Sequence, residues 1–186
     1  MLNTLVDQFI HSPRFVVWLV PFSKISLQLS PSPQLPLIQS FCNNGDPPEN
    51  NFYKVNFDAA TFRSTNSAGI GVIVHDFARE VIGALSLLIS MPQSVATAEA
   101  LACLRAMKFA AEIGLTWVVI EGDSAVIINA LTTANGDQTS HGNIIEDICA
   151  LALGFQLVDF HHVPRDCNSV VDAVAKKAST VTSLQV

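Results

Sequence analysis

Four acidic residues have positions in the sequence that could bring their carboxylates together. Asp58 ends the alternating stretch YKVNFD, a pattern typical of a half-buried strand, so its side chain lies on the polar side near the strand's end. Glu99 has apolar residues three and four positions away on both sides, which places it on a helix face that packs against a sheet. Asp123 follows the buried stretch WVVIEG, and Asp172 lies in the last predicted helix.

Three of these acids have a structural explanation when each is taken alone. Glu99 could be a glutamate whose carboxylate reaches the rim of the core. Asp123 could simply cap the helix that begins with SAVIINAL. Asp172 shares its helix side with Asn168 and Lys176, so it could be a solvated surface acid. Only the combination of the four residues favours a shared function.

Four carboxylates in one pocket would require a compensating positive charge. Like charges a few ångströms apart raise each other's pKa, and divalent cations are the usual remedy. Carboxylate oxygens as the only ligands favour Mg²⁺ or Mn²⁺ over zinc. Two such ions about 4 Å apart stabilise the attacking and leaving oxygens in phosphodiester cleavage. The acids therefore predict a site for two Mg²⁺ or Mn²⁺ ions, with Asp58 as a bridging ligand.

The elements that must position these acids follow one another in the order βββαβααβα. The sequence predicts strands over 52–59, 68–76, 80–90, 116–123 and 155–163, and helices over 94–114, 124–134, 142–153 and 168–179. Short turns make the first three strands an antiparallel meander. A right-handed crossover then lays the fourth strand parallel to the first, so that Asp58 and Asp123 become neighbours with Glu99 above them. This order predicts a mixed α/β sheet.

Length and proline content predict one domain behind a leader. A chain of 186 residues with 49% hydrophobic content buries one ordinary core. Seven of its nine prolines lie in the first 48 residues, and residues 31–51 read as an extended linker. We expect a poorly ordered Pro-rich leader over residues 1–49, a domain over 50–180 and a tail over 181–186.

Charge and cysteines limit the partners and the compartment. The net charge of -6 argues against a protein that holds nucleic acid by bulk electrostatics, so a polyanion would have to be held locally. The four cysteines lack the close spacing of a zinc site and read as reduced thiols, which predicts a nuclear or cytoplasmic protein. The apolar stretch FVVWLV at 15–20 is far too short for a membrane span, and no secretory signal is evident.

The chain resembles the ribonuclease H superfamily, and within it the plant reverse-transcriptase-like branch related to retrotransposons. The stretches KVNFDAA, GIGVIVHD, TAEALACLRAM, VVIEGDS and HHVPRDCNSVVDAVAKKA carry this resemblance. It implies a mixed five-stranded sheet with helices on both faces, and Asp58, Glu99, Asp123 and Asp172 as catalytic metal ligands. It also implies an endonuclease that hydrolyses the RNA strand of RNA/DNA hybrids with two Mg²⁺ or Mn²⁺ ions.

The resemblance extends to residues around the last acid. His162 matches the family's histidine, which assists product departure or proton transfer, and Asn168 matches an asparagine one helical turn before Asp172. We expect Asn168, Arg165 and Lys176 to bind nucleic acid, and the protein to be a monomer. The turn near Arg79 lacks the family's glycine, and no Lys- and Trp-rich protrusion stands between residues 124 and 155.

Two other functions remain open on the sequence. One is a catalytically inactive nucleic-acid-binding module derived from a retrotransposon ribonuclease H domain. The other is an exonuclease or DNA-strand transferase, because related folds use similar carboxylate sets. The intact acid set disfavours the first, and the meander followed at once by a Glu-bearing helix disfavours the second.

Overall fold

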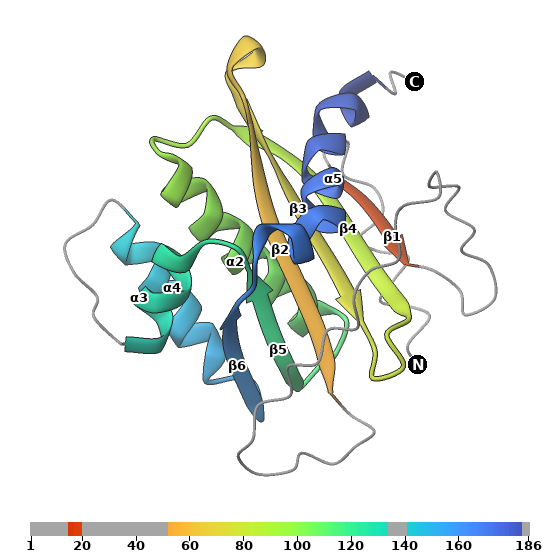
Figure 1. Cartoon of the computed structure of the whole chain (residues 1–186), viewed down its shortest axis with the longest axis vertical. Helices are drawn as coiled ribbons and strands as arrows, with labels where there is room; N and C mark the ends of the chain where they lie inside the picture. The colour runs from red at the N-terminus through yellow and green to blue at the C-terminus, as the bar shows by residue number, and fades with distance from the viewer. Residues whose placement is uncertain (1–14, 20–51, 134–140, 184–186) are drawn as a thin grey trace.

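The structure is a computed structural model that describes residues 15–19, 52–133 and 141–183. Its strands form one six-stranded mixed sheet in the order β1-β4-β3-β2-β5-β6. The strands are β1 (Phe15–Leu19), β2 (Tyr53–Phe62), β3 (Ser67–His75), β4 (Val81–Ser90), β5 (Trp117–Gly122) and β6 (Leu157–His162). The five predicted strands are all present, and the mixed sheet with helices on both faces is confirmed (Figure 1).

Strands β2, β3 and β4 form the predicted antiparallel meander. The register pairs Asp58 with Gly71 between β2 and β3. The turn from β3 to β4 lacks glycine, and Arg79 takes the left-handed conformation there with φ 67°. The carboxylate of Asp76 accepts a hydrogen bond from the backbone N–H of Glu80 at 2.8 Å, which holds this turn closed.

Helix α2 (Val95–Glu112) carries the chain from the meander to the parallel strands. It begins after Ser94, whose hydroxyl accepts a hydrogen bond from the backbone N–H of Thr97 at 3.0 Å. It ends where Gly114 takes a positive φ of 81°, a conformation that glycine adopts without strain. Ala102, Cys103 and Met107 are fully buried on α2, so the helix packs closely on the sheet.

Strands β5 and β6 lie parallel to β2 on its other side. Strand β5 pairs with β2, and β6 pairs with β5. The main core lies between this sheet and α2, with Val55, Phe57, Val118 and Ile120 fully buried against it. Helices α3 (Ala125–Thr133) and α4 (Gly142–Ala152) lie on the same side as α2 (Figure 1).

Helix α5 (Ser169–Lys177) covers the opposite face of the sheet, in front of β3 in Figure 1. Close approach requires glycine on β3, because a Cβ added at Gly71 would lie 2.5 Å from the carbonyl oxygen of Val171. The hydroxyl of Ser86 also donates a hydrogen bond to the carbonyl of Val174 at 2.9 Å. Two short 3₁₀ helices flank α5, namely η2 (Arg165–Asn168) and η3 (Ala178–Ser183), and a third, η1 (Arg63–Thr65), ends β2.

Strand β1 lies within the segment that the sequence assigns to the leader. It pairs antiparallel with β4, from Phe15 opposite Leu87 to Leu19 opposite Gly83. The rest of the expected leader lies outside the described residues, and so do three residues of the expected tail. The domain limits at residues 50 and 180 therefore stay predictions.

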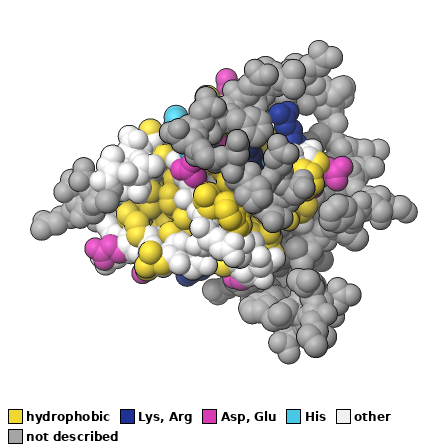
Figure 2. Space-filling view, turned by 90° about the horizontal axis from the view of Figure 1, so that it is seen from below, with side chains coloured by type: hydrophobic (Ala, Val, Ile, Leu, Met, Phe, Trp, Pro, Cys, Tyr) yellow, Lys and Arg dark blue, Asp and Glu magenta, His cyan; other side chains and the backbone are white. Residues whose placement is uncertain are grey.

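The described part of the chain contains no membrane-spanning helix, and one of its faces is drawn in Figure 2. In the described ranges, no helix combines the length and the apolar character needed to span a bilayer. Figure 2 shows hydrophobic side chains gathered in the middle of this face, with few Lys or Arg among the described residues in view.

Candidate active site

The candidate site lies where strands β2 and β5 separate. Their pairing ends at Asn56 opposite Glu121, while β2 continues beside β3. Asp58 comes two residues after this last pair, and Asp123 comes immediately after the end of β5. Strands β3 and β4 are added to the sheet on one side of β2, and strands β5 and β6 are added on the other side, so the strand order switches between β2 and β5. Ligand sites in α/β sheets form at such places, outside the carboxyl ends of the strands.

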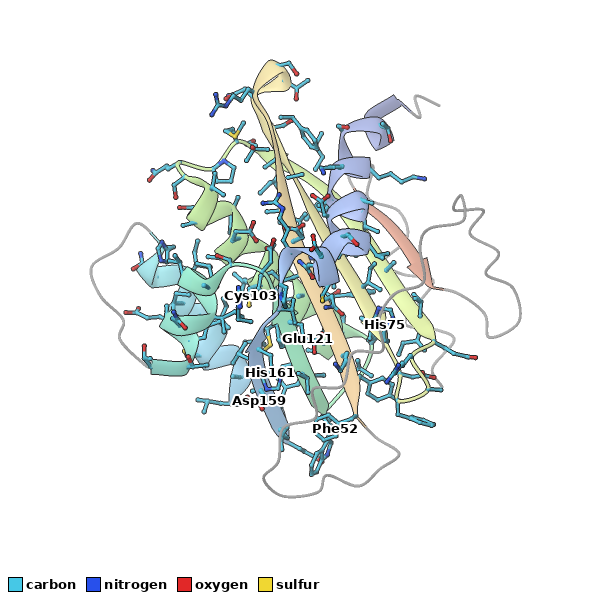
Figure 3. The ribbon with its side chains drawn as sticks, in the orientation of Figure 1. Phe52, His75, Cys103, Glu121, Asp159 and His161 are labelled. Carbon is cyan, nitrogen blue, oxygen red and sulfur yellow. The ribbon has the colours of Figure 1, made fainter. Side chains whose placement is uncertain are left out.

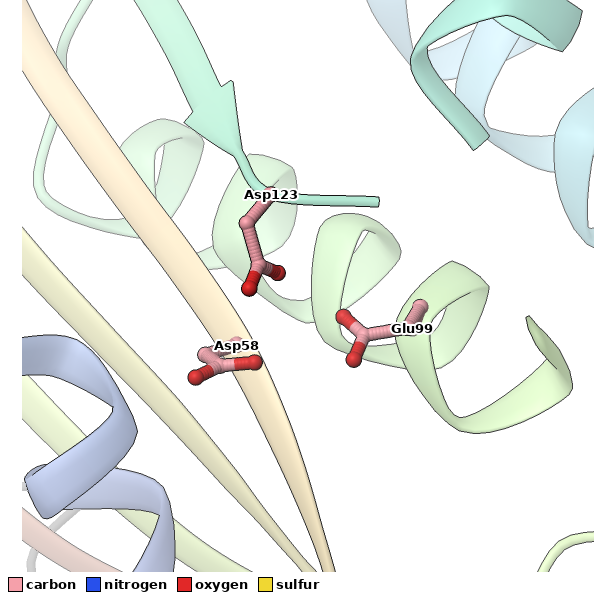
Figure 4. Close-up of side chains that lie close together, drawn as sticks. All are labelled: Asp58, Glu99 and Asp123. Atoms are coloured by element: carbon pink, nitrogen blue, oxygen red, sulfur yellow. The ribbon is translucent and has the colours of Figure 1, made fainter. Parts of the chain in front are cut away.

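Three carboxylates converge in this opening (Figure 4). One oxygen each of Asp58, Glu99 and Asp123 lies within 4.8 Å of the other two. Glu99 reaches the group from α2, on the sheet-facing side that the sequence predicts. Asp58 is 4% exposed and Glu99 8% exposed, so two of the three acids are largely withdrawn from water.

Burial and crowding disfavour the charged forms of these acids. Burial, followed by the charges of Asp58 and Asp123, raises the pKa of Glu99 to about 8. Burial and the charge of Asp123 raise the pKa of Asp58 to about 6. The hydrogen bond that Asp58 accepts from the N–H of Ala59 at 2.8 Å acts in the opposite direction and lowers this pKa. Oxygen Oε2 of Glu99 is buried without a hydrogen-bond partner among the described residues. Near neutral pH the metal-free site therefore favours a proton on Glu99, which a cation could replace.

These residues fit a divalent cation. The donors are all carboxylate oxygens, which suits Mg²⁺ or Mn²⁺. A cation would give the unpartnered oxygen of Glu99 a ligand bond. Its positive charge would also stabilise the ionised forms of Asp58 and Glu99, whose pKa values are raised. Asp58, Glu99 and Asp123 are thus the residues that would hold it.

Asp172 lies outside this group of three. It sits on α5, where its carboxylate pairs with Nζ of Lys176 at 2.6 Å. Its charge nevertheless raises the pKa of Asp58, so the two residues are close enough to interact. The structure therefore joins three of the four predicted acids and leaves the fourth beside them, paired with a predicted nucleic-acid-binding lysine.

The other predicted site residues lie around the same opening. Nε2 of His162 is 3.2 Å from the backbone oxygen of Asp123, and since a carbonyl only accepts, the imidazole donates. Arg165 is exposed, and its charge lowers the pKa of both Asp58 and Glu99. The nucleic-acid contact expected of Asn168 stays a prediction, and in the structure this residue is buried. Its side chain is 2% exposed and donates to the carbonyl of Phe57 at 2.9 Å, so it holds η2 against β2.

A second polar group beside the site was missed by the sequence reasoning. The carboxylate of Glu121 is buried on β5 and accepts hydrogen bonds from Nζ of Lys54 at 2.8 Å and Nδ2 of Asn56 at 3.1 Å. Glu121 also lies beside His161 on β6 (Figure 3). Alternation in YKVNFD gave a usable signal, since it places Lys54 and Asn56 on the same side as Asp58.

Comparison with known proteins assigns a class to this fold and site. The chain has the ribonuclease H fold and resembles ribonuclease H1 from the halophilic archaeon Halobacterium salinarum, with 25% identity and a TM-score of 0.63 over 69% of this chain and 98% of that one. It also resembles the N-terminal ribonuclease H domain of a Mycobacterium tuberculosis protein, with 18% identity and a TM-score of 0.62 over 71% of this chain and 96% of that one.

A third similar structure is LC11 ribonuclease H1, from compost, in complex with an RNA/DNA hybrid. Identity there is 20% and the TM-score 0.60, over 67% of this chain and 94% of that one. No curated protein sequence matches the chain. The profile of the reverse transcriptase-like family matches residues 56–178, and this chain belongs to that family.

Proposed function

We propose that the protein is a metal-dependent endonuclease that hydrolyses the RNA strand of RNA/DNA hybrids. The convergence of Asp58, Glu99 and Asp123 within 4.8 Å carries this proposal. The ribonuclease H fold and the hybrid bound by the similar LC11 enzyme support it. The products would be a 5′-phosphate and a 3′-hydroxyl.

Each residue of the site has a part in this proposal. Asp58, Glu99 and Asp123 would hold two Mg²⁺ or Mn²⁺ ions, and Asp172 would complete the ligand set. When bound, the ions supply the activation of water and the stabilisation of the leaving oxygen. His162 is exposed at the edge of the site, where it assists product departure or proton transfer. Contacts with 2′-hydroxyl groups select the RNA strand.

The proposal includes the setting in which the enzyme works. We place it in the nucleus or the cytoplasm, and the three cysteines of the described residues, Cys103, Cys149 and Cys167, are free thiols as a reducing compartment requires. We further propose that it acts as a monomer.

A cleavage assay tests the proposal. A hybrid labelled on its RNA strand is incubated with the protein in Mg²⁺ and in Mn²⁺, and the products are separated by length. We expect internal cuts that Asp58→Asn and Asp123→Asn both abolish, because each removes a ligand. Asp147→Asn, on an exposed position of α4, is the matched control and should leave cleavage unchanged.

A binding assay separates the enzyme from an inactive binding module. Hybrid affinity is measured with Ca²⁺, which supports binding without turnover, and with chelator. The enzyme should bind more tightly with the ion, because two cations turn an acidic pocket into one that accepts a phosphate. Equal affinity in both conditions, with no cleavage in Mn²⁺, would leave only the binding module.

A further inference from the structure

The carboxylate of Glu121 links strands β2 and β5 at the point where they separate. Their last backbone pair is Asn56 opposite Glu121. Oε1 of Glu121 accepts a hydrogen bond from Nζ of Lys54 at 2.8 Å, and Oε2 accepts one from Nδ2 of Asn56 at 3.1 Å. Both donors lie on β2 and the acceptor lies on β5. We call these three side chains the fork bridge, and Glu121 is labelled in Figure 3.

The opposite face of the same two strands is also closely packed. Successive side chains of a strand point to opposite faces, so Phe57 lies on the other face from Asn56. Phe57 is fully buried, and a Cβ added at Gly122 would overlap its ring. The fork bridge on one face and this contact on the other therefore fix β2 against β5 immediately before they part.

Two of the candidate metal ligands stand one step beyond the fork bridge. Asp58 follows Asn56 by two residues on β2, and Asp123 follows Glu121 by two residues. Two residues of extended chain span about 7 Å and return the side chain to the same face. Figure 4 shows the carboxylates of Asp58 and Asp123 near each other, and one oxygen of each lies within 4.8 Å of the other. Their separation therefore depends on how β2 and β5 are held at the fork bridge.

The site itself tends to widen this fork. The register of β2 with β5 contains no pair beyond Asn56 and Glu121. When ionised, Asp58 and Asp123 repel each other across the opening. The fork bridge opposes this repulsion, because a carboxylate that accepts from an ammonium group and an amide forms strong, directional links. Both oxygens of Glu121 are used in this way.

We propose that Glu121 is a positioning residue: through Lys54 and Asn56 it holds β2 and β5 at the separation at which Asp58 and Asp123 bind a small divalent cation. This inference rests on the proposed function. Replacing groups behind metal ligands commonly costs 10- to 100-fold in affinity. Mg²⁺ requires near-ideal octahedral geometry with bonds of about 2.1 Å, whereas Ca²⁺ accepts longer bonds and flexible geometry. The fork bridge thus favours Mg²⁺ over Ca²⁺.

The surroundings of the fork bridge allow it to be altered. It borders a cavity of about 360 Å³ that His161, His162 and Cys167 also line. A shorter side chain at residue 121 would leave space that is polar and wide enough for water. The side chain of Lys54 is 40% exposed, so its ammonium group can turn to solvent when the carboxylate is lost.

Metal titration without nucleic acid tests the proposal. Mg²⁺ and Ca²⁺ affinities are measured by calorimetry for the unaltered chain, Glu121→Ala and the control Gln156→Ala. Gln156 accepts a hydrogen bond from Nε1 of Trp117 at 2.6 Å, so the control removes a side-chain link at the opposite end of β5. We expect Glu121→Ala to weaken Mg²⁺ binding about tenfold and to change Ca²⁺ binding little. Gln156→Ala should leave both affinities unchanged.

Two more variants separate position from charge, because Glu121→Ala also removes a negative charge that attracts cations. Asn56→Ala breaks one link of the fork bridge and leaves the net charge unaltered, so we expect several-fold weaker Mg²⁺ binding. Glu121→Gln keeps the length of the side chain and an oxygen for Lys54, and should bind Mg²⁺ more tightly than Glu121→Ala. Far-ultraviolet circular dichroism checks that each variant is folded.

The outcomes separate this inference from the proposed function. Unchanged Mg²⁺ affinity in Glu121→Ala, with cleavage of the hybrid by the unaltered chain intact, would overturn the role of Glu121 alone. Equal losses of Mg²⁺ and Ca²⁺ affinity would overturn it too, and so would Asn56→Ala with unaltered Mg²⁺ affinity. The expected Mg²⁺ losses, with no cleavage by the unaltered chain, would support the positioning role and reject the enzyme. No Mg²⁺ binding by the unaltered chain would overturn both.

Discussion

The metal-free protein should lose stability as the pH rises because of Glu99, and replacing Glu99 by glutamine should remove this loss. The pKa of Glu99 is raised from 4.5 to about 8 in the native protein, while the unfolded chain titrates near the ordinary value. Between these values the native state keeps a proton that the unfolded state has released. The stabilising effect of this group is therefore complete below pH 4.5 and is lost as the pH rises through about 8.

The magnitude follows from the interval. Each pH unit changes the free energy of unfolding by about 1.4 kcal/mol, so at pH 7 the ionisation of Glu99 in the unfolded chain costs the native state about 3 kcal/mol. A glutamine has no proton to lose, and its amide can donate to the neighbouring carboxylates. Glu99→Gln should thus gain up to about 3 kcal/mol at pH 7 and almost nothing at pH 4.

Urea unfolding in chelator at several pH values measures this difference. Glu146→Gln, at an exposed position of α4, is the control and should follow the unaltered chain. The pKa of Asp58 is raised to about 6, so below that pH the free energy of unfolding still changes with pH in both proteins, by a smaller amount in total. Parallel curves for Glu99→Gln and the unaltered chain from pH 5 to pH 8 would refute the reasoning, because Glu99 would then have an ordinary pKa.

Three further outcomes are expected. Asn168→Ala should lower the free energy of unfolding by about 1–3 kcal/mol in chemical denaturation, because the carbonyl of Phe57 loses its donor in a buried place. Gly71→Ala should destabilise the protein more than Gly154→Ala. A methyl group at residue 71 would lie 2.5 Å from the backbone of α5, whereas a methyl group at residue 154 would meet only the carbonyl oxygen of Leu151 at 3.3 Å. Equal melting temperatures of the two variants would contradict this. A thiol reagent should label Cys149 and Cys167 in the native protein and Cys103 only after unfolding, because Cys103 is fully buried and its pKa is raised; mass spectrometry of digested fragments identifies the labelled sites.

Much of the fold could be predicted because local patterns decide it. Alternation marked β2, the alanine-rich run that stops at Gly114 marked α2, and short turns marked the meander. The place of Glu99 followed from its apolar neighbours three and four residues away, and a right-handed crossover then brought Asp58 and Asp123 together. These inferences use periodicity and chain order, which the sequence contains.

Contacts between distant segments could not be predicted in the same way. The bond from Asn168 to Phe57 joins residues 111 positions apart, and helical periodicity alone placed Asn168 with the polar residues of its helix. The same limit applies to Asp172, whose partner Lys176 is one turn away on an exposed face. Local pattern shows which residues are polar, while tertiary packing decides which of them are buried.

Strand β1 has a consequence for how the protein can be shortened. It occupies the hydrogen-bonding edge of β4 along five residue pairs, from Phe15 opposite Leu87 to Leu19 opposite Gly83. A fragment that starts at residue 50 would keep every metal-ligand candidate but leave the backbone groups of β4 unpaired along that edge. Open edges pair with other chains, so such a fragment would tend to aggregate even though it keeps all the carboxylates of the candidate site.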